Sequence, residues 1–164
     1  VSLVPRVIGQ TAEAQSKKTT HKRKQWDEVS FFEALQNEVG SEACTVARKL
    51  LEWATAKDFE IKWGQGKTHG SFYPVVNCFG GKHTIFGVFT SGNIEVDLGH
   101  KPEGVHKAKV SFISSLNSIS GVDIPDKAIN TWKNFSIKAL QSEKSLNKFL
   151  SASEEFAESL LDDK

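Results

Sequence analysis

The sequence predicts an α+β fold, in which an antiparallel four-stranded meander sheet follows two helices and carries further C-terminal helices packed on it. Apolar residues recur every three or four positions over residues 30–56 and again over 142–161, as on the buried side of a helix. Residues 59–98 instead alternate apolar and polar residues between short glycine-containing turns, as β-hairpins do. The 164 residues are 38% hydrophobic and 25% charged, the balance of an ordinary globular domain.

Two helices are expected ahead of the sheet. Ser30 and Glu33 form a capping-box pattern, so the first helix should begin near Ser30 and end before Gly40. The second should begin at Ser41, because its apolar residues keep a helical spacing. These residues are predicted to face the core: Ala43, Val46, Ala47, Leu50, Leu51 and Ala54.

Four strands are expected over residues 59–63, 71–79, 83–90 and 94–98. The second and third are apolar on both faces, which predicts central strands covered on both sides and places the first and fourth at the edges. Pro74 has no amide hydrogen, so its strand requires a bulge or an unpaired position there.

The C-terminal part should contain a helix over residues 105–116, with Lys109 on its exposed flank, and a short helical turn from Pro125. Residues 135–139 can add a fifth strand to the sheet. A last helix is predicted from Ser142 to the end of the chain.

Charge and composition divide the chain into a basic linker or tail of a preceding domain, residues 1–25, and a single α+β domain, residues 26–164. The linker has six Lys and Arg against one Glu, whereas the remainder has fifteen against nineteen acids. A mildly acidic domain is not expected to wrap nucleic acid over much of its surface. No membrane-length apolar run occurs, the two cysteines are far apart, and methionine is absent, which predicts a cytoplasmic fragment of a longer protein.

The Gly66-Lys67-Thr68 sequence ends as a phosphate-binding loop ends, but Ile61 occupies the position of the required first glycine. Strand alternation follows the loop where a helix is required. A glycine-rich hairpin loop is the preferred interpretation. Because the cysteines and histidines also lack zinc-ligand spacing, we expect no cofactor and no metal site.

Aromatic and cationic residues gather around the first predicted hairpin. Rings beside cations on the rim of a sheet are suited to stack on bases and contact phosphates, although the rings can equally belong to the core. The candidate nucleic-acid site consists of Trp63, Lys67, His69, Ser71, Tyr73 and Lys82.

Four charged residues offer a weaker catalytic hypothesis. Glu60 and Lys62 match the end of a metal-dependent nuclease signature, and Glu95 and Asp97 share one face of the fourth strand, where they can hold a metal ion. The simpler interpretation is that these charges are solvated and protect edge strands from pairing.

Six short segments between residues 24 and 126 support a family resemblance: Gln25-Trp26-Asp27, Ser30-Phe31-Phe32, residues 47–54, Trp63-Gly64-x-Gly66-Lys67, Gly70-Ser71-Phe72-x-Pro74 and Gly121-Val122-x-Ile124-Pro125. With these segments the chain resembles the C-terminal domain of uncharacterised prokaryotic proteins that carry an upstream RecB-like or NucS-like nuclease domain. The resemblance implies that nuclease residues belong to the upstream domain and that this chain is a partner of it.

Three functional hypotheses follow. The first is a non-catalytic accessory domain of a nuclease-like or defence-related protein, in which Lys67 and Lys82 contact phosphates and Trp63 or Tyr73 stacks on a base. The alternative is a protein-interaction or oligomerisation module that docks its sheet or last helix on the upstream domain or on a second copy. The third is a metal-dependent nuclease built on the four charged residues above.

Overall fold

The computed structural model describes residues 25–78, 81–99, 101 and 104–162. The predicted linker, apart from Gln25, and the predicted strand end at Phe79 lie outside the described residues. The elements are α2 (Glu28–Glu38), α3 (Ser41–Ala56), β1 (Glu60–Trp63), β2 (Ser71–Cys78), β3 (Gly81–Thr84), β4 (Gly87–Phe89), β5 (Asn93–Asp97), α4 (His106–Asn117), the 3₁₀ turn η1 (Asp126–Asn130), β6 (Trp132–Ser136), the 3₁₀ turn η2 (Ile137–Leu140) and α5 (Glu143–Asp162).

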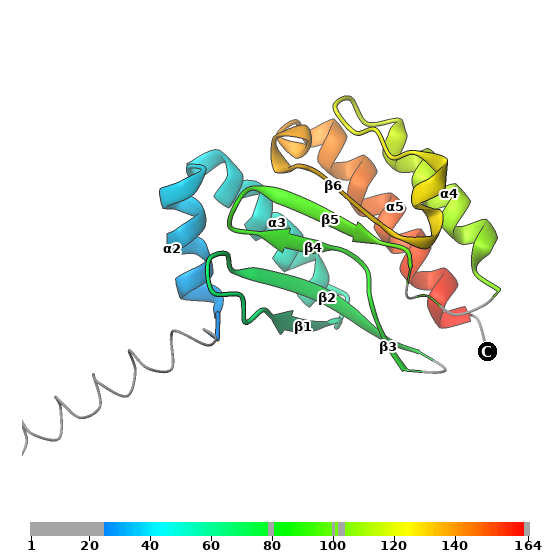
Figure 1. Ribbon diagram of the computed structural model, residues 1–164, viewed down its shortest axis with the longest axis horizontal. Coiled ribbons are helices and arrows are strands. Elements are labelled where there is room, and N and C mark those ends of the chain that lie inside the picture. Colours follow the sequence, from blue (N-terminus) through cyan, green and yellow to red (C-terminus); the bar gives the residue numbers. More distant parts are fainter. Residues whose placement is uncertain (1–24, 79–80, 100, 102–103, 163–164) are drawn as a thin grey trace, which may run out of the picture.

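The chain has the predicted α+β fold, with helices at both ends of an open antiparallel sheet. The strand order is β1-β2-β4-β5-β6, and β3 pairs with β2. Figure 1 shows α3 and α5 lying behind the strands, on one face of the sheet. The expectation that the central strands are covered on both sides is therefore wrong for the described part of the chain. None of the described helices has the length and apolar character needed to cross a membrane.

One core joins the covered face of the sheet to the helices, from Phe31 in α2 to Leu160 in α5. The apolar residues predicted for α3 are all buried, as their spacing required. Phe149 of α5 contacts Phe86, with ring centroids 4.9 Å apart, and so fixes the last helix against the sheet. Because Phe86 and Phe149 are buried against each other, α5 packs on the face of the sheet to which Phe86 points.

A β-bulge opposite Pro74 divides the predicted third strand into β3 and β4. Val75 pairs with Thr84, but Phe72 pairs with Val88, so the register shifts by one residue between them. Ile85 donates its amide to the Pro74 carbonyl at 3.0 Å. Of the two alternatives that the sequence allows at this proline, a bulge or an unpaired position, the structure has the bulge. The bulge also explains why Ile85 and Phe86, although adjacent, are both fully buried.

The first helix begins earlier than predicted. Asp27 is the N-cap of α2, and its carboxylate accepts the Ser30 amide at 2.8 Å, while the Asp27 amide donates to the Ser30 hydroxyl at 3.0 Å. The prediction of a cap at Ser30 is wrong because Ser30 occupies the third helical position of the same reciprocal motif.

The last strand and α4 also correct the sequence prediction. The strand expected over 135–139 is β6, which begins at Trp132 and pairs with β5, so β5 is not an edge, whereas β1 is. Lys109 is only 7% exposed, and its ammonium donates to the Asn130 side chain at 3.3 Å. The prediction of an exposed flank is wrong because η1 packs against α4 there. The predicted helical turn after Pro125 is η1.

Candidate functional site

The side of the sheet that faces away from α3 and α5 is called the open face here (Figure 1). Alternation along β1 directs Ile61 and Trp63 to the core, so Glu60 and Lys62 point to the opposite side. Residues that are paired between neighbouring strands point to the same side of the sheet, so the strand registers show which residues of the other strands share the side of Glu60 and Lys62. The open face carries Glu60, Lys62, Tyr73, Val75, Lys82, Gly87, Phe89, Glu95, Asp97, Trp132 and Asn134.

One row of neighbouring residues crosses all five ordered strands of the open face. Lys62 pairs with Tyr73, Gly87 with Glu95, and Glu95 with Asn134, and the Phe72–Val88 pair places Tyr73 beside Gly87. Adjacent strands lie about 4.8 Å apart, so Lys62 and Glu95 stand roughly 14 Å from each other. The row therefore has a cation near one end and a carboxyl toward the other.

An aromatic patch occupies the middle of the open face. A Cβ atom on Gly87 would lie 2.6 Å from Cε1 of Tyr73, which shows that the tyrosine ring rests on this glycine. The Tyr73 and Phe89 rings meet edge to face, with centroids 6.0 Å apart. Neither ring belongs to the core cluster, and Trp132 at the β6 edge is 57% exposed. The open face thus has apolar side chains that the helices do not cover.

Charge on the open face is separated between its two sides. Lys82 forms an ion pair with Glu60 at 2.8 Å, so these two charges compensate each other. Among the described residues Lys62 forms no ion pair, which leaves it as the net positive charge on β1. Glu95 and Asp97 lie on the same side of β5, making that part of the face negative.

Glu95 and Asn134 form a polar neighbourhood beside the aromatic patch. Burial, with a smaller contribution from the Asp97 charge, raises the pKa of Glu95 above its ordinary value of 4.5. The side-chain oxygen of Asn134, opposite Glu95 in the register, is buried and accepts no hydrogen bond from the described residues.

Titration of the Tyr73 phenol can be followed without interference from other tyrosines, because Tyr73 is the only tyrosine in the chain. Burial raises the pKa of its phenol above 10.0, a hydrogen bond with Ser71 lowers it, and the Glu95 charge raises it. We therefore expect Glu95→Gln to lower the pKa of Tyr73 while burial keeps it above 10.0. Alkaline titration followed by phenolate absorbance measures this shift, and Glu52→Gln on the other side of the molecule is the control.

The same titration predicts the sign of a stability change. Because the folded state holds the Tyr73 proton more tightly than the unfolded chain, the free energy of unfolding should fall as pH rises above 10.0 toward the folded pKa. A Tyr73→Phe variant should not have this component. An unchanged Tyr73 pKa in Glu95→Gln would contradict the placement of the carboxyl beside the ring.

The structure does not gather the predicted nucleic-acid residues on one surface. Trp63 packs into the core against Phe31 and Phe72, with ring centroids 5.9 and 5.5 Å away. Ser71 is only 4% exposed. Nδ1 of His69 lies 3.5 Å from a carboxylate oxygen of Glu38, which is an ion pair when the histidine is protonated. Lys82 is paired with Glu60. Of the six residues, Ser71, Tyr73 and Lys82 share the open face, where Ser71 is buried, whereas exposed Lys67 lies in the Gly64–Gly70 loop.

Trp26, to which sequence patterns gave no role, holds that loop in place. Its indole N–H donates to the Gly66 carbonyl at 2.8 Å, and its backbone amide donates to the Gly64 carbonyl at 3.1 Å. A Cβ atom on Gly70 would lie 2.5 Å from the indole ring, so the ring packs directly on that glycine. The loop is thereby fixed to the residues that precede α2.

The predicted nuclease residues do not form one metal site. Glu60 and Glu95 lie on β1 and β5, with β2 and β4 between them, so their backbones are more than roughly 14 Å apart. A shared ion requires ligand oxygens within about 2.6 Å of the metal. Within the described ranges, no group of three histidine, cysteine, aspartate or glutamate side chains is arranged to hold a metal ion.

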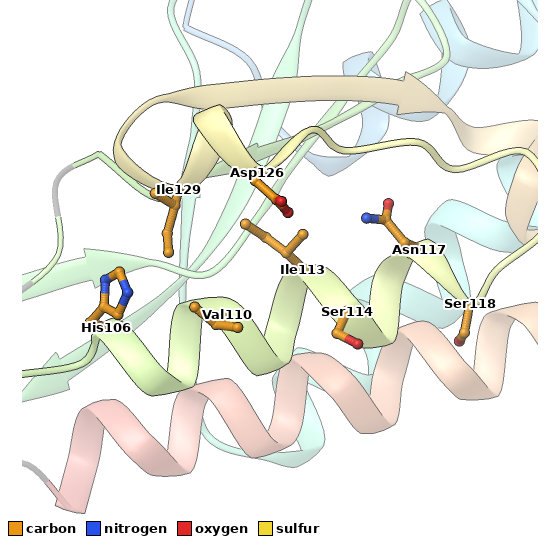
Figure 2. Close-up of a pocket in the computed structure, with 8 residues that line it drawn as sticks. All are labelled: His106, Val110, Ile113, Ser114, Asn117, Ser118, Asp126 and Ile129. Atoms are coloured by element: carbon orange, nitrogen blue, oxygen red, sulfur yellow. The ribbon is translucent and has the colours of Figure 1, made fainter.

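A groove of about 680 Å³ lies between α4 and η1 (Figure 2). His106, the first residue of α4, and Asn117, its last residue, both line the groove. The Asn117 side chain is engaged by the backbone of Ile124, to which it donates at 2.9 Å and from which it accepts at 2.7 Å. Apolar Val110 and Ile113 line the part between. Of the described residues that line this groove, His106 and Asp126 are the ones that can carry a charge.

The open face and the α4 groove are two surface features of the described chain with room for a partner. The open face extends over five strands and combines aromatic rings with charges of both signs. A scan against protein-family models, a search of curated proteins and a search of solved structures each gave no match to this chain.

Proposed function

We propose that this chain is a protein-interaction module and that the open face is its contact surface. The observation that supports this proposal is that the described helices cover one face of the sheet, while Tyr73, Phe89 and Trp132 lie on the other. Tyrosine, phenylalanine and tryptophan are enriched where protein interfaces are buried. An uncovered aromatic patch on a sheet is accordingly suited to bind another protein.

The charges of the open face favour a protein over a nucleic acid. Lys62 and Lys82 are the cations of this face, and Glu60, Glu95 and Asp97 are its acids. Phosphates bind to surfaces on which cations predominate, because displaced counterions provide much of the affinity. We also propose a cytoplasmic setting, since the free thiol of Cys44 is suited to a reducing compartment.

Site-specific photo-cross-linking in cells that make the protein tests this function. A photo-cross-linking amino acid replaces Trp132, which is 57% exposed on the open face. Matched controls carry the same amino acid in place of Val29 on α2 or Leu161 on α5, which are 69% and 38% exposed. We expect protein adducts from position 132 that exceed those from both controls and survive nuclease treatment.

The cross-linked products separate the possible outcomes. Adducts with another protein, including an upstream domain of the same parent chain, support the interaction module, as do adducts with a second copy. Adducts that nuclease removes would instead indicate nucleic acid. A yield from position 132 no higher than from the control positions would contradict the proposal.

Nucleic-acid binding through the Gly64–Gly70 loop is a second candidate function. The observation that favours it is that Trp26 donates to the Gly66 carbonyl and Gln25 accepts from the Gln65 side chain, which fixes the loop that carries exposed Lys67. A loop whose backbone is already fixed loses little conformational freedom when one of its side chains contacts a phosphate. This candidate places the chain as an accessory domain of a nuclease-like or defence-related protein, as its family resemblance implies.

A salt series tests this second candidate. Labelled single- and double-stranded DNA and RNA are titrated with the full chain and with Lys67→Ala, and Lys127→Ala is the control. Loss of one phosphate contact should reduce the slope of log affinity against log salt by about 0.7 to 0.9. An unchanged slope, or no binding at low salt, would exclude this loop as a nucleic-acid site.

A further inference from the structure

We infer that β1 pairs edge to edge with β1 of a second copy of this chain, antiparallel and about a two-fold axis through Ile61. This inference goes beyond the proposed function, because it assigns a partner to the edge of the sheet rather than to the aromatic patch. β1 is an outer strand and pairs on one side with β2 (Figure 1). An outer strand presents unpaired backbone groups with which a second strand can pair.

The register with β2 shows which backbone groups of β1 point outward. The Gly64 amide donates to the Ser71 carbonyl at 2.9 Å, and residues that exchange hydrogen bonds alternate with residues that do not along an antiparallel pair. The N–H and C=O groups of Ile61 and Trp63 therefore point away from β2. Among the described residues, no backbone group pairs with them, and the Gln25 side-chain amide reaches the Trp63 carbonyl at 3.4 Å. This edge is thus able to take up another strand.

The sequence around Ile61 is complementary to itself when two copies run antiparallel. Residues 59–63 read Phe-Glu-Ile-Lys-Trp, so an axis through the central isoleucine places the acid opposite the base and the phenylalanine opposite the tryptophan. Glu60 of each copy then stands beside Lys62 of the other, where opposite charges stabilise a strand pair. Because the two-fold axis repeats every contact, two such ion pairs form.

The charges of β1 select this register over its neighbours. An axis through Lys62 would set that cation opposite its own copy, and an axis through Glu60 would do the same with two carboxylates. Like charges directly opposite each other destabilise a strand pair. Lys62 forms no ion pair within the described ranges, whereas Glu60 has the Lys82 ammonium at 2.8 Å on its inner side. The second copy therefore supplies the counter-charge that Lys62 lacks in the described part of a single chain.

The helix-covered side of the same edge is apolar. Phe59, Ile61 and Trp63 pack against the core but are only partly buried, so each remains partly exposed at the edge. In the proposed pair, Phe59 lies opposite Trp63 of the second copy, and aromatic pairs across neighbouring strands are favourable. An axis perpendicular to the sheet leaves both open faces on one side, so their aromatic patches stay accessible.

Charge reversal tests this geometry. The mass of the full chain is measured by sedimentation velocity for wild type, Lys62→Glu, Glu60→Lys and an equimolar mixture of the two variants, up to about 1 mM. One strand edge is a small interface, so the wild type should approach twice its 18.1 kDa only at high concentration. Each single variant sets like charges opposite each other twice and should dimerise about tenfold more weakly, or less still.

The mixture is the decisive sample. A chain with Lys62→Glu and a chain with Glu60→Lys present opposite charges at both contacts, so their heterodimer should form near the wild-type concentration. The double variant Glu60→Lys, Lys62→Glu should likewise dimerise with itself. Lys133→Glu on β6 and Glu155→Lys on α5, both exposed, form the matched control pair and should leave the wild-type association unchanged. Far-UV circular dichroism confirms that every variant is folded.

Hydrogen exchange locates the contact independently of charge. The Ile61 amide, which points outward from β1, donates to the Ile61 carbonyl of the second copy in the proposed pair. Its exchange should slow as the wild-type concentration is raised, and should slow less in Lys62→Glu. The Gly64 amide, which donates to Ser71 within one chain, is the control and should exchange equally at all concentrations.

Each remaining outcome overturns the inference. Dimers that persist in both single variants, or an Ile61 amide whose exchange does not slow, would place the contact elsewhere. A mixture that stays monomeric while the wild type dimerises would exclude the pairing of Glu60 with Lys62. A wild type that keeps the mass of one chain at about 1 mM would exclude a second copy at this edge. Trp132 lies on β6, at the opposite edge of the sheet, so cross-linking from position 132 succeeds or fails separately.

Discussion

Replacing Trp26 with alanine should lower the free energy of unfolding by about 3–5 kcal/mol, the range for removing a buried tryptophan. Trp26 is 5% exposed, its indole ring packs on Gly70, and its N–H donates to the Gly66 carbonyl. The substitution removes the ring and leaves that carbonyl without its hydrogen-bond donor. Denaturant unfolding of the variant and the wild type measures the difference.

Trp26→Phe separates the two contributions of this residue. Phenylalanine retains an aromatic ring above Gly70 but cannot donate to the Gly66 carbonyl. It should therefore be less destabilising than alanine. A loss of less than about 1 kcal/mol in Trp26→Ala would be too small for a buried, packed tryptophan. Such a result would contradict the role of Trp26 as the anchor of the Gly64–Gly70 loop.

Replacing Asn117 with alanine should lower the free energy of unfolding by about 1–3 kcal/mol, because it removes two part-buried hydrogen bonds that contribute roughly 0.5–1.5 kcal/mol each. The Ile124 amide and carbonyl both bind the Asn117 side chain, at 2.7 and 2.9 Å, and Ile124 is 2% exposed. Urea unfolding measures the loss of stability, and hydrogen exchange at the Ile124 amide shows where it occurs.

Asn117→Asp is the matched variant for this site. Its carboxylate can still accept from the Ile124 amide but cannot donate to the Ile124 carbonyl, so an intermediate loss is expected. Unchanged protection of the Ile124 amide in Asn117→Ala would contradict this arrangement. The segment matters to the open face because it precedes η1 and β6, the strand that carries Trp132.

The sequence was most informative where local periodicity alone determines structure. The apolar residues of α3 follow one helical stripe, and all six of those predicted to be buried are buried. Pro74 predicted a bulge or an unpaired position because a residue without an amide hydrogen cannot complete a regular ladder. In both cases the required information lies within a few residues of the feature, so no tertiary contact is needed to interpret it.

Features that depend on distant partners were not predictable in this way. Ser30 was mistaken for the cap of α2 because Asp27 and Ser30 form one reciprocal motif, of which the pattern shows only a part. Lys109 occupies an apolar position of α4, but its burial depends on η1, which lies some twenty residues further along. The sequence pattern does not extend the predicted strand to Trp132, because an edge strand shows weak alternation.

The open face also combines features that the sequence pattern predicts with features that depend on strand pairing. Lys62, Glu95 and Asp97 attract attention in the sequence because alternating charges on strands suggest metal-binding chemistry. Their arrangement along opposite sides of one sheet face follows only from the strand registers. Tyr73 and Phe89 could be assigned to this face rather than to the core only once β2 and β4 had been paired.

Protection of Trp132 tests the central claim, that the open face is occupied by a protein partner, most directly. Trp132 is 57% exposed in the single chain, so hydroxyl-radical footprinting of dilute purified protein should oxidise it readily, whereas Trp26, at 5%, should react little. In cells that make the protein, the account predicts that Trp132 becomes protected while Val29 on α2 reacts as before. Equal oxidation of Trp132 in cells and in dilute solution would contradict the account.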